Sequence, residues 1–166
     1  VHNNNRTNFA PAGNIVGNVP AGTGCMILST KNVEIFSNVV SENNFAGILV
    51  TNYLLINDPP SDPNYSPYPS GIYIHDNTHT MTGTLNPTQP DAIQQIIGVL
   101  DAYSLAQPNL LMDGLLTSPT DVCIKEGAAT FVNLNAWDPN FASVTTDVTV
   151  HDCTKDPLPA IEFEEY

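Results

Sequence analysis

Basic side chains are scarce in this sequence: Lys and Arg total 4, against 17 Asp and Glu, and the formal net charge is −13. Binding to nucleic-acid phosphates or to an anionic membrane needs clusters of Lys and Arg, which such a chain does not supply. Nucleic acid and anionic membranes are therefore poor partners, and no direct membrane insertion is expected. Divalent cations and basic proteins are the electrostatic partners that the composition favours.

Long apolar runs and a targeting segment are also missing. No stretch approaches the roughly 18 residues that a membrane-spanning helix needs, and no signal peptide is visible. Because the chain begins at Val1 without Met, we expect a processed protein or a fragment. Hydrophobic residues make up 42% of the sequence, which is enough for a folded core, while 14 Pro, 10 Gly and abundant Asn indicate many turns and little helix.

Cysteine is too rare to define a disulfide framework, since the chain has only three. Cys123 and Cys153 lie in polar, loop-like surroundings, DVCIKEG and VHDCTKD, whereas Cys25 lies inside the apolar run GCMIL. We predict a Cys123–Cys153 disulfide with Cys25 as a small core residue; three free thiols are the alternative. A disulfide, the low Lys content and the acidic composition favour an extracytoplasmic protein, in the periplasm, at the cell surface or secreted.

Three segments begin with Gly and continue with alternating apolar residues: GCMILS, GILVTN and GIYIHD. They start at Gly24, Gly47 and Gly71, so their two spacings are nearly equal. Alternation is typical of strands, and stacking the three segments predicts columns of inward-facing residues. The predicted columns are Cys25, Ile48 and Ile72, then Ile27, Val50 and Ile74.

A repeat of this length, with short strands and Asn or Gly turns, is typical of a right-handed parallel β-helix. We therefore predict an all-β fold with about three coils of parallel β-helix over residues 1–83. One amphipathic helix and an irregular, disulfide-bearing C-terminal cap are expected over residues 84–166. Leucine-rich repeats are similar in length, but their Leu-x-x-Leu-x-Leu frame is absent. Asn38 and Asn77 are expected to stack as a ladder in equivalent turns.

The N-terminal stretch VHNNNRTNFA resembles VVSENNFAG, and aligning the two places Val1 beside Val40. The chain would then begin partway round a coil, with strand edges uncovered at that end. Solenoids of few repeats with open ends are usually unstable alone. We therefore expect a partner at this end, either the preceding part of the same protein, a second copy stacked end to end, or another protein.

One helix pattern stands out in the remainder, in QPDAIQQIIGVLDAYSL. Its apolar stripe consists of Ile93, Ile96, Ile97 and Leu100. Pro90 and Asp91 suit a first turn, and the stripe is expected to pack over Met26, Leu49 and Tyr73. The Pro-rich segment 57–70 is expected to project as an insertion.

Two further segments follow the helix. The stretch DVCIKEGAATFVNL is compatible with a hairpin that turns at Glu126–Gly127, and the acidic tail is expected to be an extended wrap or a loose end.

These motifs resemble the bacterial parallel β-helix repeat proteins of unknown function that carry a paired β-helix repeat. The resemblance rests on NFAPAGNIVGNVPAGTG, NVEIFSN, PYPSGIYIHDN, the MDG after the helix, CIKEGAATFVNLN and HDCTKDPLPAI. It implies an exported protein whose further coils precede Val1. It also implies a neighbouring exported protein with c-type haem features as a possible partner, and it brings no established activity.

The stretch YIHDNTH holds the most suggestive polar cluster, with His75, Asp76 and His79 close together. Tyr73 precedes them on the strand. A His beside carboxylates suits a base or a metal ligand, so His75 and Asp76 are the candidate metal ligands. The remaining candidate ligand-binding residues, expected to fold back beside His75 from the insertion, are Asp62, Tyr65 and Tyr68. The alternative is a structural role, with Asp76 in a turn and His75 solvated on the strand.

Two functions fit these observations. The favoured one is an exported scaffold or binding protein that engages another protein or a glycan, through the solenoid surface or the open end. The alternative is a carbohydrate-active enzyme of the polysaccharide lyase or epimerase type, which needs a base and a cation to stabilise a carbanion. The four cationic residues, Arg6, Lys31, Lys125 and Lys155, do not gather on one face of the repeat. No catalytic residue is assigned and no cofactor is expected. Ca²⁺ is compatible with the acidic composition, but no Asp-x-Asp-x-Asp-Gly loop is present.

Overall fold

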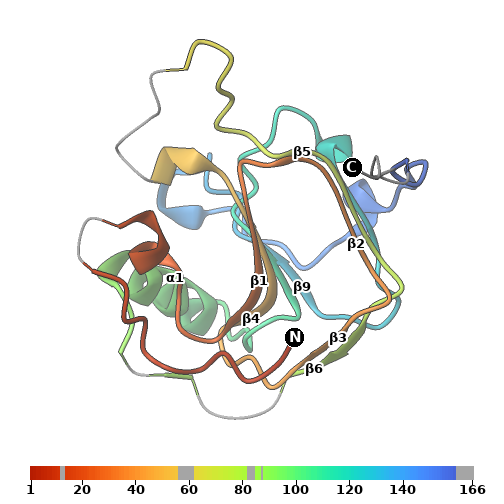
Figure 1. The fold of residues 1–166 in the computed structure, drawn as a ribbon. Helices are drawn as coiled ribbons and strands as arrows, with labels where there is room; N and C mark the ends of the chain where they lie inside the picture. The colour runs from red at the N-terminus through yellow and green to blue at the C-terminus, as the bar shows by residue number, and fades with distance from the viewer. Residues whose placement is uncertain (12–13, 56–61, 82–84, 87, 160–166) are drawn as a thin grey trace, which may run out of the picture.

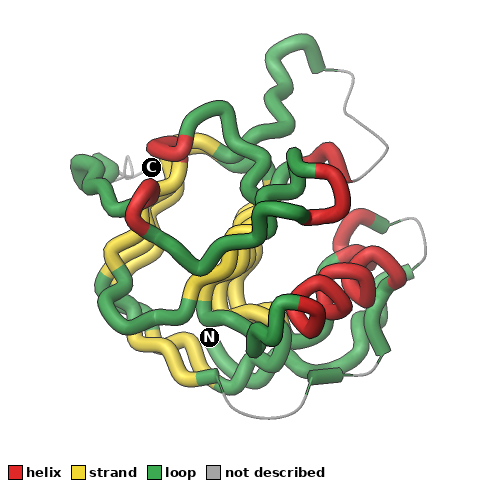
Figure 2. The backbone as a smooth tube through the Cα atoms, turned by 180° about the vertical axis from the view of Figure 1, so that it is seen from behind, coloured by secondary structure: helices red, strands yellow, loops and turns green. Residues whose placement is uncertain are grey.

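A computed structural model describes residues 1–11, 14–55, 62–81, 85–86 and 88–159. Its strands form three parallel sheets (Figures 1 and 2). The four-stranded sheet consists of β1 (Thr23–Leu28), β4 (Ala46–Thr51), β7 (Leu110–Met112) and β9 (Phe131–Asn133), in that order. The three-stranded sheet consists of β2 (Lys31–Phe36), β5 (Ser70–His75) and β8 (Val122–Lys125). The third sheet pairs β3 (Val39–Ser41) with β6 (Thr78–Thr80).

Helical structure accompanies the sheets. The α-helix α1 spans Asp91–Ala102, and short 3₁₀ turns span Ile15–Asn18, Tyr53–Leu55, Pro119–Asp121, Pro139–Phe141 and Thr149–His151. Among the described residues, no helix is both long and apolar enough to span a bilayer.

The predicted fold class, an all-β right-handed parallel β-helix of about three coils, is wrong. The strands are parallel, but they form three separate small sheets of unequal size, and α1 makes the arrangement mixed α/β rather than one clear solenoid. The reason lies in the length of chain between paired strands. Cys25 pairs with Ile48, one apparent period further along, whereas Ile48 pairs with Leu110, which lies more than two such periods beyond it. The spacing from Cys25 to Ile48 is therefore not a constant period of the chain.

The predicted columns are correct for one pair of strands and wrong for the next. Cys25 pairs with Ile48, and Ile27 with Val50, as the alternation indicated. The third member of each column lies in a different sheet, because Ile72 pairs with Val33 of β2. Aligning the three Gly segments therefore placed β5 beside β4, whereas β5 lies between β2 and β8.

The four-stranded sheet is buried on both faces. One face contributes alternate residues such as Ile48 and Val50 to a core shared with Ile72 and Ile74 of the three-stranded sheet. The other face contributes Leu49 to a core shared with α1. This explains why every residue of β4 is buried. Burial on both faces is the usual condition of parallel sheets.

Helix α1 confirms the helix prediction, and Ile93 and Leu100 of its stripe are buried. It lies against the four-stranded sheet, on the side opposite the three-stranded sheet (Figures 1 and 2). Met26 and Leu49 pack in the same cluster, as expected. Tyr73 does not, because it belongs to β5 of the other sheet.

Two glycines of the repeat, Gly24 and Gly47, allow neighbouring backbones to approach closely. A Cβ at Gly24 would collide with the carbonyl oxygen of Gly47, and a Cβ at Gly47 would lie 2.6 Å from the carbonyl oxygen of Asn109. Both contacts involve backbone, which cannot move away cheaply. Gly is therefore needed at both positions because a side chain would collide with neighbouring backbone, which the alternation alone did not indicate.

Asparagine ladders join the turns. Asn38 donates to Oδ1 of Asn77 from its backbone N, at 2.9 Å, and from Nδ2, at 3.1 Å, so the predicted ladder is confirmed. The same offset along the chain recurs at the N-terminus, where His2 forms a parallel bridge with Ser41. The predicted alignment of Val1 with Val40 is therefore correct.

The C-terminal region is more regular than the predicted cap. Its strands β7, β8 and β9 extend sheets that begin in the first half of the chain. The predicted hairpin at Glu126–Gly127 is wrong, because β8 and β9 enter different sheets on either side of that turn. The Cys123–Cys153 disulfide is confirmed, and Cys25 is free and half-buried against the core. Residues 57–61 of the predicted insertion and 160–166 of the predicted tail lie outside the described residues.

Candidate functional site

The predicted cluster around His75 lies on the three-stranded sheet. The His75 ring is held between two carboxylates: Nδ1 is 2.7 Å from Oδ2 of Asp76, and Nε2 is 3.0 Å from Oε1 of Glu34. The hydrogen bond with Asp76 raises the pKa of His75 above its usual value, and Glu34 adds to this, while burial opposes it. The other oxygen of Glu34 accepts the backbone N–H of Leu158 at 3.1 Å. That N–H and His75 lower the pKa of Glu34.

The rings of Tyr73 and Phe36 both stack on the His75 ring. The centroid of the Tyr73 ring is 4.1 Å from that of the His75 ring, with 25° between the two planes. The centroid of the Phe36 ring is 5.3 Å from that of His75, and those two planes are nearly parallel. Phe36 pairs with His75 across the two strands, and its side chain remains half exposed. The structure thus brings together His75, Asp76 and Tyr73 of the predicted site and adds Glu34 and Phe36.

The other predicted residues lie elsewhere. His79 forms a separate buried pair, with Nε2 2.7 Å from Oε2 of Glu126. In the segment before β5, Asp62 accepts from the backbone N–H of Asn64, and Tyr65 packs edge-on against Tyr53. The ring of Tyr68 lies beside that of Trp137, with 6.2 Å between the ring centroids. None of these described contacts reaches His75.

The predicted cluster has limited chemical freedom. Both ring nitrogens of His75 already meet carboxylate oxygens, so neither is free to accept a substrate proton without breaking a contact. Among the described residues, no group of three or more His, Cys, Asp and Glu side chains is arranged to hold a metal ion. Two of the few cations are also engaged: Lys125 pairs with Asp152, and Lys155 donates to the Thr120 carbonyl oxygen.

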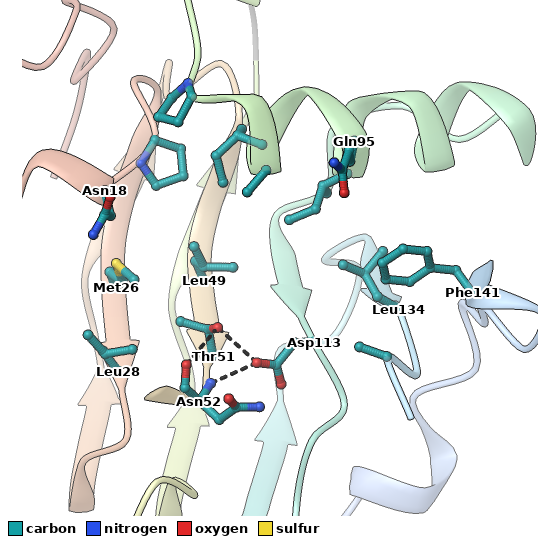
Figure 3. A pocket seen from close by; sticks show the side chains of 16 residues that line it. Asn18, Met26, Leu28, Leu49, Thr51, Asn52, Gln95, Asp113, Leu134 and Phe141 are labelled. Carbon is teal, nitrogen blue, oxygen red and sulfur yellow. Dashed lines mark hydrogen bonds between the residues drawn. The ribbon is translucent and has the colours of Figure 1, made fainter. Parts of the chain in front are cut away.

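A second site, which the sequence analysis missed, is a pocket of about 390 Å³ between α1 and the four-stranded sheet (Figure 3). We call it the helix–sheet pocket. Its apolar wall consists of Pro20, Met26, Leu28, Leu49, Pro90, Ala92, Ile93, Ile96, Leu134, Ala136 and Phe141. Its polar lining consists of Asn18, Thr51, Asn52, Gln95 and Asp113. Ligand pockets typically have this volume range and this mixture of apolar walls and few polar groups.

The polar end of the pocket is a connected network at the ends of two strands. Oδ2 of Asp113 accepts the Thr51 hydroxyl at 2.8 Å and the backbone N–H of Asn52 at 2.7 Å (Figure 3). Oδ1 of Asp113 accepts the backbone N–H of Leu115 at 2.9 Å. All three side chains, Thr51, Asn52 and Asp113, are buried.

Burial raises the pKa of Asp113 above its usual range, and the three hydrogen bonds work in the opposite direction because they stabilise the carboxylate. Asn52 is fully buried and its Nδ2 has no partner. An amide N–H₂ that is buried without an acceptor lowers the stability of the folded state. Asn52 thus keeps one buried donor without an acceptor, next to the Asp113 carboxyl.

Sequence reasoning missed this pocket for a definite reason. Asn52 and Asp113 are 61 residues apart and meet only because β4 and β7 are neighbours in the sheet. The number of residues between β4 and β7 does not match the apparent period, so no repeat in the sequence indicated that Asn52 and Asp113 meet. The MDG motif that contains Asp113 contributed only to the family resemblance and predicted no role for Asp113.

Comparisons of the chain with models of known protein families, with curated proteins and with solved structures give no match. The resemblance of the sequence motifs to the repeat family stays a prediction. The disulfide is compatible with an extracellular location.

Proposed function

We propose that this chain is an extracytoplasmic binding protein that holds a small, mainly apolar molecule in the helix–sheet pocket. The observation that carries the proposal is the pocket itself, about 390 Å³ in volume, with apolar walls from α1 and the four-stranded sheet and a polar end at Thr51, Asn52 and Asp113. An apolar cavity that ends in a few convergent polar groups is the usual form of a ligand site.

The walls support a binding role of this kind. They come from both β1 and β4, through residues such as Met26 and Leu49, and from α1 through Ile93 and Ile96. Helix and sheet are both regular elements that pack on a common core, so the cavity is preformed. None of the described residues that line it is cationic, which favours an uncharged ligand body.

The experiment is a titration with Nile red, an uncharged dye whose emission shifts to the blue in apolar surroundings. We expect saturable binding to the full chain. The variant Ala92→Trp places a large ring in the pocket lining from the exposed first turn of α1, and we expect it to weaken binding at least tenfold. The matched control is Ala102→Trp, at the exposed last residue of the same helix and outside the lining.

Circular dichroism establishes that both variants fold. Equal dye affinity in the wild type and the two variants would contradict the proposal, as would the absence of saturable binding in the wild type.

A second candidate function, glycan binding, has its own support in the stacked rings of Tyr73, His75 and Phe36. Exposed aromatic faces beside carboxylates such as Asp76 can stack on a sugar ring and accept hydrogen bonds from its hydroxyls. Chemical-shift changes confined to Phe36 and its neighbours on adding neutral oligosaccharides would support it, and Phe36→Ala should remove them. A β-elimination assay against uronate polymers tests the enzymatic alternative of a lyase or epimerase.

A further inference from the structure

The single tryptophan of the chain lies at the surface, in the turn that follows β9. The side chain of Trp137 is 57% exposed. Its ring lies beside that of Tyr68, and the two planes are tilted by 33°. These residues are far apart in the sequence, so the tertiary structure brings the two rings together. Tyr and Trp rings at a surface offer a large apolar face to a ligand at little entropic cost.

The backbone beside each ring is fixed by hydrogen bonds. In the turn that carries Trp137, the backbone N–H of Asp138 donates to the carbonyl oxygen of Asn135 at 2.9 Å. In the segment that carries the tyrosine, the carbonyl oxygen of Pro67 accepts the backbone N–H of Tyr53 at 3.0 Å. The aromatic surface is therefore preorganised, which lowers the cost of ordering it around a ligand.

Trp137 also lines a pocket of about 180 Å³, which we call the tryptophan pocket. This pocket shares no lining residue with the helix–sheet pocket. Its exposed apolar part consists of Trp137 and Val150, each more than half exposed. Pockets that enclose a whole drug-sized ligand begin at roughly 300 Å³, so the tryptophan pocket has room for one ring of a longer molecule.

The polar side chains of the tryptophan pocket are hydrogen-bond acceptors. Nδ2 of Asn135 donates to the carbonyl oxygen of Ser143 at 2.6 Å, which identifies the other end of the amide as oxygen. That Oδ1 receives no donor from the described residues. The Thr117 hydroxyl gives its proton to the Asp121 carboxylate and keeps its lone pairs. Asn135 is half-buried and Thr117 is exposed, so a ligand that fits the pocket has to bring donors.

Charge narrows the class of ligand further. The described residues that line the tryptophan pocket include no Asp, Glu, Lys or Arg. His151 lines it as well, but this side chain is 2% exposed and its Nδ1 lies 2.9 Å from the carbonyl oxygen of Pro119, so it is a structural part of the wall. An ammonium ligand would find no carboxylate in the lining, and the net charge of −13 disfavours an anionic ligand.

We propose that the tryptophan pocket binds one sugar ring of a neutral glycan. The C–H face of the ring stacks on Trp137, and sugar hydroxyls donate to the oxygens of Asn135 and Thr117. Tyr68 extends the aromatic surface for the next sugar. This site is independent of the helix–sheet pocket and uses different residues from the His75 cluster on the three-stranded sheet.

The first experiment uses the wild-type chain. Because Trp137 is the only tryptophan, intrinsic tryptophan fluorescence reports on this pocket. The chain is titrated at physiological ionic strength with neutral hexasaccharides of glucose, mannose, galactose or xylose, and with hexagalacturonate and hexalysine as charged probes. We expect a saturable change in emission, with protection from acrylamide quenching, for at least one neutral hexasaccharide. Its affinity should be at least tenfold higher than that of either charged probe. No saturable change with any neutral hexasaccharide, or tighter binding of a charged probe, would overturn the proposal.

A pair of variants locates the sugar. Trp137→Ala removes the stacking face, and we expect the affinity for the bound hexasaccharide, measured by calorimetry, to fall at least tenfold. The matched control is Phe36→Ala, which truncates another half-exposed aromatic ring, in the His75 cluster, and should leave the affinity unchanged. Loss of affinity in Phe36→Ala alone would place the sugar at the His75 cluster and overturn the proposal, while the second candidate function would stand. If Trp137→Ala does not fold, wild-type fluorescence still decides.

A second pair tests the hydroxyl contact. Thr117→Val keeps the shape of the side chain and removes its acceptor, so we expect about fivefold weaker binding of the same hexasaccharide. The matched control is Thr120→Val, at an exposed position outside the lining, which should bind like the wild type. Circular dichroism establishes that both variants fold. Unchanged affinity in Thr117→Val would overturn the assignment of that contact.

Discussion

Glu34 of β2 and His75 of β5 are 41 residues apart in the chain and form a contact, with Oε1 of Glu34 3.0 Å from Nε2 of His75. They are diagonal neighbours on the outward face, because Glu34 pairs with Tyr73 and Phe36 pairs with His75. Diagonal neighbours on one face of a sheet are within reach of long side chains. With Asp76 on the other ring nitrogen, His75 is tied to two carboxylates.

The first prediction concerns the titration of His75. Asp76, and then Glu34, raises the pKa of His75 above the usual 6.5. The stability that this imidazolium contributes is therefore fully present below pH 6.5 and is lost as the pH rises through the raised value. We expect Asp76→Asn to lower the pKa more than Glu34→Gln, as measured by NMR titration of the imidazole signals.

Asp62→Asn removes a carboxyl that does not contact His75 and serves as the control. A His75 signal that titrates at or below its usual pKa in the wild type, or that shifts equally in all three variants, would count against the contacts.

The second prediction concerns the core between the two larger sheets. Ile48 is fully buried and pairs with Cys25 on one side and Leu110 on the other. The substitution Ile48→Asp leaves a charge without a partner there, and we expect it to cost several kcal/mol and to prevent soluble folding. Val39→Asp adds the same charge at a half-exposed position and should fold normally. An unchanged melting temperature for Ile48→Asp would refute the register.

The third prediction concerns the disulfide. Cys123 and Cys153 are separated by 30 residues. In the chain-entropy model, closing a loop of this size stabilises the folded state by roughly 3 to 4 kcal/mol. We expect a loss of about that size in urea unfolding of the double variant Cys123→Ser with Cys153→Ser.

The free thiol supplies the control for the disulfide. Burial raises the pKa of the Cys25 thiol, so it should react slowly with iodoacetamide in the folded protein and Cys25→Ser should change stability much less. Non-reducing peptide maps that link Cys25 to another cysteine would contradict the pairing.

The fourth prediction concerns association. Within the described residues, the two larger sheets end at β1 and β2, which begin the strand order of their sheets. Exposed strand edges recruit further chains. We expect the isolated chain to self-associate through these edges, with protection from hydrogen exchange over residues 24–30 that increases with protein concentration. A folded monomer in analytical ultracentrifugation, with rapid exchange over residues 24–30 at all concentrations, would refute this.

Local patterns in the sequence predicted several elements correctly. Helix α1 follows from the spacing of its isoleucines and Leu100, because a helix displays i, i+3 and i+4 on one face. The polar surroundings of Cys123 and Cys153 distinguished them from Cys25 in its apolar run. Strand alternation placed Cys25 and Ile27 on the inward face. Each of these inferences needs only neighbouring residues and the geometry of one element.

The sequence by itself thus determined the segments that form β1, β4, β5 and α1 and which side of each is apolar, because these depend on local backbone periodicity. The repeat indicated that β1 and β4 are neighbours, and the Asn38–Asn77 ladder joined the turns before β3 and β6, but only the tertiary structure decided the remaining strand neighbours. Some paired residues are close along the chain, such as Leu110 and Phe131, whereas others, such as Ile48 and Leu110, are separated by a long connection that includes α1. Loops of such different length are tolerated because the entropic cost of closing a loop grows only slowly with its length. Both candidate sites depend on which strands are neighbours, since Glu34 contacts His75, and Asn52 contacts Asp113, only because their strands are adjacent in a sheet.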